Sequence, residues 1–142
     1  MKILIIDGQG GGIGSNLIEM LRQKGPGDLQ ITAVGTNAVA TSTMLRAGAD
    51  TGATGENAVV WNAARAELIL GPVGIVLANA MLGEITPAAA AAVASSEATK
   101  ILVPIAKSSV QIAGLAEQGL SSYLADAVLR VNQWAGQAER KL

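Results

Sequence analysis

The sequence contains no cysteine and no histidine. Without cysteine the chain has no disulfide framework, no thiol nucleophile and no zinc–thiolate site. Without histidine it lacks both the commonest general base of enzymes and their commonest metal ligand. Catalytic arrangements of the Asp–His and Cys–His types are therefore excluded, and we expect no metal site.

Aromatic and charged residues are also scarce. Aromatics make up 2% of the chain, and charged residues 15%, against a usual charged share of roughly 25%. Isoleucine, valine, leucine and alanine must fill the core, which suits a parallel sheet buried on both faces. A surface with so little charge predicts a homo-oligomer. The alternative is an alanine-rich helical exterior that contacts nothing.

No cluster of basic residues is present, and the net charge is −1, so the sequence predicts no nucleic-acid partner. The uncharged stretch over residues 68–83 is too short for a comfortable membrane span and contains three glycines and a proline. The N-terminus passes from Met1-Lys2 directly into an aliphatic run, without the pattern of a signal peptide. We therefore expect a cytoplasmic protein with no membrane partner.

Aliphatic runs alternate with helical periodicity along the chain. This order predicts an α/β fold, a Rossmann-like three-layer αβα arrangement, with residues 1–142 forming one nucleotide-binding domain. The sheet would be mostly parallel with four or five strands, the fifth being an antiparallel edge strand over 110–115. The other strands are expected at 3–6, 29–34, 67–70 and 101–105. Helices are expected at 13–24, 38–47, 73–82, 86–95 and 120–138, and residues 50–57 are expected to form a loop. Residues 58–66 suit either a short helix or a strand, and we favour the helix.

A glycine-rich loop stands between the first strand and the first helix, with five glycines in seven residues. Glycine allows sharp turns and close approach of the backbone to a ligand, and the N-terminus of a helix attracts phosphate. The loop follows a strand and opens a helix, which is the context that a nucleotide site requires. The alternative is a tight turn without a ligand, for which one or two glycines would suffice. The expected phosphate-binding residues are Gly8, Gln9, Gly10, Gly11, Gly12, Ile13 and Gly14, with Ser15 and Asn16 in the first helical turn.

Two further turns are expected at the same edge of the sheet. NAD-binding domains usually carry an acidic residue at the end of the second strand, but this chain has Thr36 and Asn37 there. Asn37 either bonds a ribose or base, or caps the next helix. The turn formed by Gly71, Pro72 and Gly74 is expected opposite the glycine loop, either as a wall of the ligand site or as a plain turn. NAD(P) or another nucleotide is the suspected cofactor.

The titratable residues expected at this edge are Asp7, Glu56, Glu84 and Lys107. Each is either catalytic or simply solvated or capping. The favoured hypothesis is a nucleotide or dinucleotide binding module or sensor. One alternative is a small oxidoreductase or nucleotide-dependent enzyme, whose active site is shared between subunits and uses Glu84, Lys107 or Asn79. Another is a structural protein that needs the glycines only for packing.

Three resemblances accompany these motifs. The 7–14 loop resembles the cofactor loop of short-chain dehydrogenases, but the lysine of that family, four residues after its tyrosine, is replaced here by Ala127 after Tyr123. Residues 10–16 and 36–38 resemble the nucleotide loop of tubulin-like division GTPases. The whole chain resembles a family of short bacterial proteins with no assigned function. This last resemblance is carried by residues 6–14, 35–38, 52–58, 71–84 and 101–104.

Overall fold

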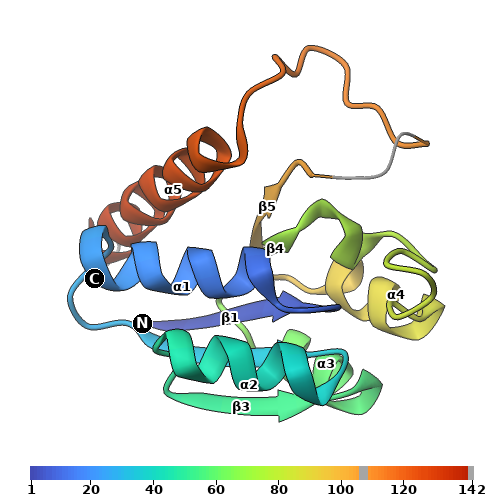
Figure 1. The fold of residues 1–142 in the computed structure, drawn as a ribbon. Helices are drawn as coiled ribbons and strands as arrows, with labels where there is room; N and C mark the ends of the chain where they lie inside the picture. Colours follow the sequence, from blue (N-terminus) through green and yellow to red (C-terminus); the bar gives the residue numbers. More distant parts are fainter. Residues whose placement is uncertain (106–108, 141–142) are drawn as a thin grey trace.

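The computed structural model describes residues 1–105 and 109–140. Its centre is a five-stranded sheet in the order β3-β2-β1-β4-β5, in which every pairing is parallel (Figure 1). The α/β fold expected from the sequence is confirmed. The strands are β1 (Lys2–Asp7), β2 (Gln30–Gly35), β3 (Thr51–Thr54), β4 (Leu68–Pro72) and β5 (Thr99–Val103).

Helices cover both faces of the sheet. Successive residues of β1 point to opposite faces, so that Ile3 and Ile5 pack in one core cluster while Leu4 and Ile6 pack in the other. Side chains of α1, α2 and α5 fill the first cluster, and those of α3 and α4 fill the second. The three-layer arrangement is thereby confirmed. The helices are α1 (Gly12–Lys24), α2 (Ala38–Ala47), α3 (Glu56–Ala63), α4 (Pro87–Ser95) and α5 (Leu120–Arg140), with one 3-10 turn, η1 (Val73–Val76).

The predicted antiparallel edge strand over 110–115 is wrong. Residues 109–119, which we call the arm, form no strand and run away from the sheet before α5 begins (Figure 1). The fifth strand is instead β3, at the opposite edge, within the expected 50–57 loop. Because β3 is a short, mostly exposed edge strand with the sequence TGAT, it lacks the aliphatic run that marks a buried strand.

The predicted helix over 73–82 is also wrong. Only the 3-10 turn η1 forms, and residues 78–84 follow as consecutive turns. Asn79, Met81 and Leu82 have φ values of 66°, 58° and 57°, a left-handed conformation that cannot continue an α-helix. The chain therefore forms a compact loop at the carboxyl end of β4.

Membrane-spanning helices are not found in the described part of the chain, since none of its helices is both long and apolar enough.

Candidate functional site

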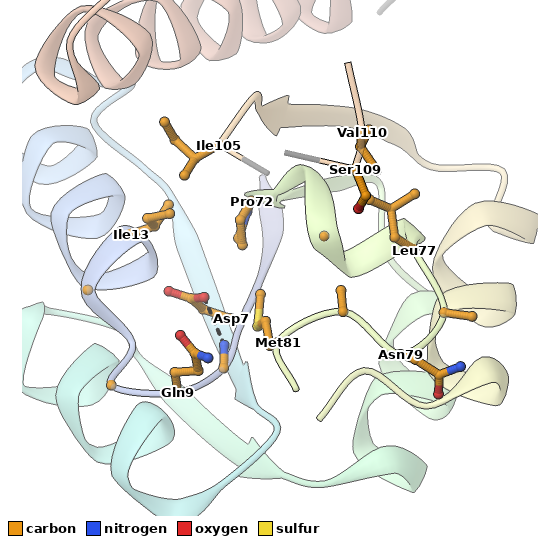
Figure 2. A pocket seen from close by; sticks show the side chains of 16 residues that line it. Asp7, Gln9, Ile13, Pro72, Leu77, Asn79, Met81, Ile105, Ser109 and Val110 are labelled. Atoms are coloured by element: carbon orange, nitrogen blue, oxygen red, sulfur yellow. Dashed lines mark hydrogen bonds between the residues drawn. The ribbon is translucent and has the colours of Figure 1, made fainter. Parts of the chain in front are cut away.

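A cavity of about 550 Å³ opens at the carboxyl ends of β1 and β4 (Figure 2). The chain leaves β1 toward β2 on one side, whereas β4 lies on the other side. Ligands of open α/β sheets bind at such a switch point. Three stretches line the cavity: Asp7, Gly8, Gln9, Gly10, Gly12 and Ile13; then Pro72, Gly74 and Leu77–Met81; and finally Ile105, Ser109 and Val110.

Three glycines of the loop are required by the fold itself. A Cβ on Gly8 would lie 2.6 Å from the Thr36 hydroxyl oxygen, and one on Gly14 would lie 2.6 Å from the Met44 sulfur. Gly11 has φ 74°, and a Cβ there would lie 2.9 Å from the backbone oxygen of Ala40. All three are buried. Their lack of a side chain needs no ligand as an explanation.

Gly10 and Gly12 differ from these three. Neither has a left-handed backbone, and a Cβ on either would meet no atom within 4 Å. Both are exposed and line the cavity. Their N–H groups donate to no other described residue. The fold would accept a side chain at both positions, so packing does not explain these two glycines.

Asp7 lies at the base of the loop, where its side chain accepts two backbone hydrogen bonds. Oδ1 accepts from the Gly8 N–H at 2.8 Å, and Oδ2 accepts from the Gly14 N–H at 2.7 Å. The residue is 4% exposed. Burial raises the pKa of Asp7 above its usual value, although the two N–H donors oppose that shift. The carboxyl therefore holds the loop against the first turn of α1.

Glu84 joins the other side of the loop to the end of β2. Its Oε1 accepts from the Gln9 N–H at 2.8 Å, the Thr36 hydroxyl at 2.6 Å and the Asn37 amide at 2.9 Å. The Thr36 hydroxyl, the Gln9 N–H and the Asn37 amide, in that order, lower the pKa of Glu84 below its usual value. We call these four residues the Glu84 hub.

The Asn37 side chain both accepts and donates hydrogen bonds. Its Oδ1 accepts from the Ala40 N–H at 2.9 Å and caps α2, while its Nδ2 also donates to the Gln9 carbonyl at 2.9 Å. The capping alternative is confirmed, because the amide oxygen accepts the N-cap hydrogen bond.

The residues predicted to bind a ligand fall into two groups. Half of them line the cavity, whereas the others lie beside it or beneath it. The Ser15 hydroxyl, for example, donates to the Gly12 carbonyl, and Gly71 packs against the backbone oxygen of Ile6. The lining group is Gly8, Gln9, Gly10, Gly12, Ile13, Pro72 and Gly74. The others are Gly11, Gly14, Ser15, Asn16, Thr36, Asn37 and Gly71.

The remaining polar candidates are dispersed. Glu56 is exposed and accepts a hydrogen bond from the Thr86 side chain, away from the cavity lining. Lys107 lies outside the described residues. Asn79 lines the cavity, and Glu84 lies in the hub. In residues 1–105 and 109–140, no group of three or more metal-ligating side chains is assembled.

Sequence reasoning missed most of the apolar walls. Leu77, Ala78, Ala80 and Met81 lie on the loop that was expected to be a helix, and Ile105, Ser109 and Val110 follow β5. The available signal was topological, since every one of these residues follows the carboxyl end of a strand. None of these residues could be identified as a wall of the cavity from its side-chain type alone.

Comparison with proteins of curated function gives no significant match. Among solved structures, the chain is similar to a dodecameric FMN-dependent Ubix-like decarboxylase from Escherichia coli O157:H7. The two share 14% sequence identity with a TM-score of 0.45, over 96% of this chain and 95% of the other. That similarity is too distant to carry a ligand or an assembly from one protein to the other. A family model described as a domain of unknown function (DUF3842) matches residues 2–136. This match confirms the resemblance expected from the sequence, and the chain belongs to that family.

Proposed function

We propose that this protein binds a phosphate-bearing small molecule of the nucleotide type. The phosphate lies against Gly10 and Gly12, and the rest of the ligand enters the cavity. One observation carries the proposal: these two glycines face open space in the cavity, with no packing or backbone requirement for glycine. A glycine that the fold does not need is expected where a ligand approaches the backbone closely.

The chemistry of the loop supports an anionic group. The uncommitted N–H groups of Gly10 and Gly12 stand where α1 begins, and the dipole of a helix favours negative charge at its N-terminus. The cavity walls next to them are largely apolar, including Ile13, Pro72 and Leu77 (Figure 2). Mostly apolar walls with a few polar groups are typical of small-molecule sites. A nucleotide, NAD(P) among the candidates, combines these two characters.

A binding module or sensor is favoured over the enzyme alternative by the state of the two carboxylates. Asp7 and Glu84 are the acidic groups nearest the loop, and both accept backbone hydrogen bonds that hold it in place. A general acid or base must instead reach a proton of the substrate. We therefore assign both residues to positioning the loop.

The test is a thermal-shift panel with NAD, NADP, FAD, FMN, NMN, AMP, ATP, GTP and inorganic phosphate. A ligand at 100 times its Kd stabilises the folded state by about 2.7 kcal/mol, which raises the Tm by several degrees. We expect one nucleotide to raise the Tm and Gly12→Val to abolish that shift. Gly27→Val is the matched control, because Gly27 is also exposed and a Cβ there would meet nothing within 4 Å.

Two outcomes contradict the proposal. If no member of the panel shifts the Tm, the protein binds none of these phosphate compounds, and the open space at Gly10 and Gly12 does not mark a phosphate site. If a shift survives Gly12→Val, the ligand binds elsewhere.

We further propose that the protein self-associates through the arm. Ile112 and Leu115 in the arm are 45% and 42% exposed, and Leu120 at the start of α5 is 37% exposed. Exposed apolar patches mark interaction surfaces, and these three residues come from one short stretch of the chain. Light scattering after size exclusion should give a mass above that of the monomer, and Leu115→Asp should lower it. A monomeric wild type, or an unchanged mass for the variant, would contradict self-association through the arm.

A further inference from the structure

We infer that the site takes a mononucleotide, meaning one phosphate with one ring system, and excludes the second nucleoside of a dinucleotide. This inference rests on the proposed binding function and narrows its ligand class. Two observations carry it: where the cavity lies relative to the glycine loop, and what fills the opposite side.

A dinucleotide needs room on both sides of the glycine loop. Sheets of this kind bind a dinucleotide across the switch point, with its phosphates at the loop. One nucleoside then lies over the end of the second strand, where a polar residue holds the ribose, and the other lies on the far side. In this protein the two sides are the end of β2 and the end of β4.

The cavity lies entirely on the β4 side. Apart from the loop itself, its described lining comes from 72–81 after β4, and from Ile105, Ser109 and Val110 after β5. None of the described lining residues comes from β2, α2 or the turn between them. In Figure 2, Asp7, Gln9 and Met81 lie below Ile13 and Pro72, and the side chains of Leu77, Ser109 and Val110 lie on the right of the view.

The β2 side is filled by the Glu84 hub and by Met81. A Cβ on Gly8 would lie 2.6 Å from the Thr36 hydroxyl oxygen, 2.7 Å from the Met81 sulfur and 3.0 Å from Glu84 Oε1. As placed, the side chains of Thr36, Met81 and Glu84 leave no room for a methyl group beside Gly8. A ribose is far larger and has no room there.

The polar groups at the end of β2 are also already engaged. The Thr36 hydroxyl donates to Glu84, and the Asn37 amide caps α2 while donating to Glu84 and the Gln9 carbonyl. A ribose on this side would have to displace three hydrogen bonds to one carboxylate. Charge-assisted hydrogen bonds of this kind are among the strongest in proteins, so this half stays closed.

The open half suits a single ring system. Pro72, Leu77 and Val110 offer apolar surface, while Ser109 adds a polar side chain to the same lining. This combination accommodates a flat ring and orients it by a small number of hydrogen bonds. The phosphate at Gly10 and Gly12 and the ring in the cavity together describe a mononucleotide.

The experiment compares ligands that differ only by the second nucleotide. FAD is FMN joined to AMP, and NAD is NMN joined to AMP, so the three mononucleotides and two dinucleotides form matched sets. Calorimetric titration of each, with inorganic phosphate alongside, should show one mononucleotide binding at least about tenfold more tightly than the dinucleotide that contains it. Gly12→Val should abolish that binding.

A second set of variants makes room for a ligand beside the end of β2. Met81→Ala removes the side chain that presses against Gly8, and Glu84→Ala removes the acceptor of the hub. Either variant should reduce the preference for the mononucleotide, because it makes room beside the end of β2. Leu82→Ala is the matched control, since Leu82 belongs to the same loop but is 83% exposed. Two variants are used because Glu84→Ala alone can weaken the fold.

The outcomes separate this inference from the proposed function. If a dinucleotide binds as tightly as its mononucleotide, and Gly12→Val abolishes both, the mononucleotide inference is overturned while the proposed function stands. If inorganic phosphate binds but no nucleotide does, the mononucleotide inference is again overturned. If no phosphate compound binds, the proposed function fails, and the inference fails with it.

Discussion

The five glycines of one short loop divide into two kinds. Gly8, Gly11 and Gly14 are buried, and a Cβ on any of them would lie less than 3.0 Å from a neighbouring atom, whereas Gly10 and Gly12 are exposed and a Cβ there would meet nothing within 4 Å. The first kind is explained by folding, and the second requires another explanation. A glycine-rich sequence therefore does not by itself reveal a ligand site. The informative glycines are those that the fold could do without.

Gly11→Ala should have the largest effect on stability. The new Cβ would lie 2.9 Å from the Ala40 carbonyl oxygen, and the residue would have to keep φ near 74°. Overpacking together with a left-handed backbone should lower the free energy of unfolding by about 2–4 kcal/mol. Urea denaturation measures this loss, and Gly27→Ala is the control. A loss no greater than that of the control would show that the loop relaxes freely.

Glu84→Gln should have a smaller, pH-dependent effect. The hub lowers the pKa of Glu84 in the folded state, so the stability that it contributes is present above pH 4.5 and is lost as the pH falls through the folded pKa. At neutral pH the variant should lose about 1 kcal/mol, because a neutral amide accepts these hydrogen bonds less strongly. The difference should shrink in acid. If the loss of unfolding free energy in the variant is the same at low pH, the ionised carboxylate of Glu84 does not stabilise the hub.

Asp7→Asn should show the opposite dependence on pH. Burial raises the pKa of Asp7 in the folded state, so the stability that this carboxyl contributes is present below pH 3.8 and is lost as the pH rises through the folded pKa. The asparagine does not titrate. The difference in unfolding free energy should therefore move in favour of the variant as the pH rises, measured by urea denaturation at several pH values. If the unfolding free energies of the two proteins change with pH in parallel, the predicted direction of the pH dependence is wrong.

Gly12→Ala should have the smallest effect on stability and a large one on binding. The position opens α1, and a Cβ there meets no atom within 4 Å. Replacing glycine by alanine in a helix gains up to about 1 kcal/mol, so the Tm should stay constant or rise slightly while the nucleotide-induced shift weakens. A loss of stability comparable to that of Gly11→Ala would place Gly12 among the packing glycines and remove the main support for a ligand.

The parts of the fold that the sequence predicts well are those with strong local signals. β1 is an unbroken aliphatic run because both of its faces are buried, and α5 shows helical spacing because Leu124, Val128 and Val131 face the core. β3 escaped prediction because it is an exposed edge. Val110–Leu115 was mistaken for a strand because its branched apolar residues suit a strand as well as they suit an exposed segment.

The candidate site was half predictable for a similar reason. The glycine loop is contiguous in sequence, so its position before a helix reveals it. The hub joins Gln9 to Glu84, 75 residues further along the chain, and no local pattern announces that contact. Of the left-handed residues Asn79, Met81 and Leu82, only asparagine is a residue type that often adopts this conformation, so the local sequence gives little sign of these turns.

The cavity forms late in folding, because its walls come from distant parts of the chain. Its walls come from 7–13, 72–81 and the residues after β5, so it is complete only when β4 and β5 have joined the sheet beside β1. Such long-range pairing is slow to form, because loop closure precedes the gain from contact. A ligand that touches all three stretches recognises only the finished chain. Such a ligand would slow unfolding without speeding folding. It would therefore prolong the lifetime of the native state.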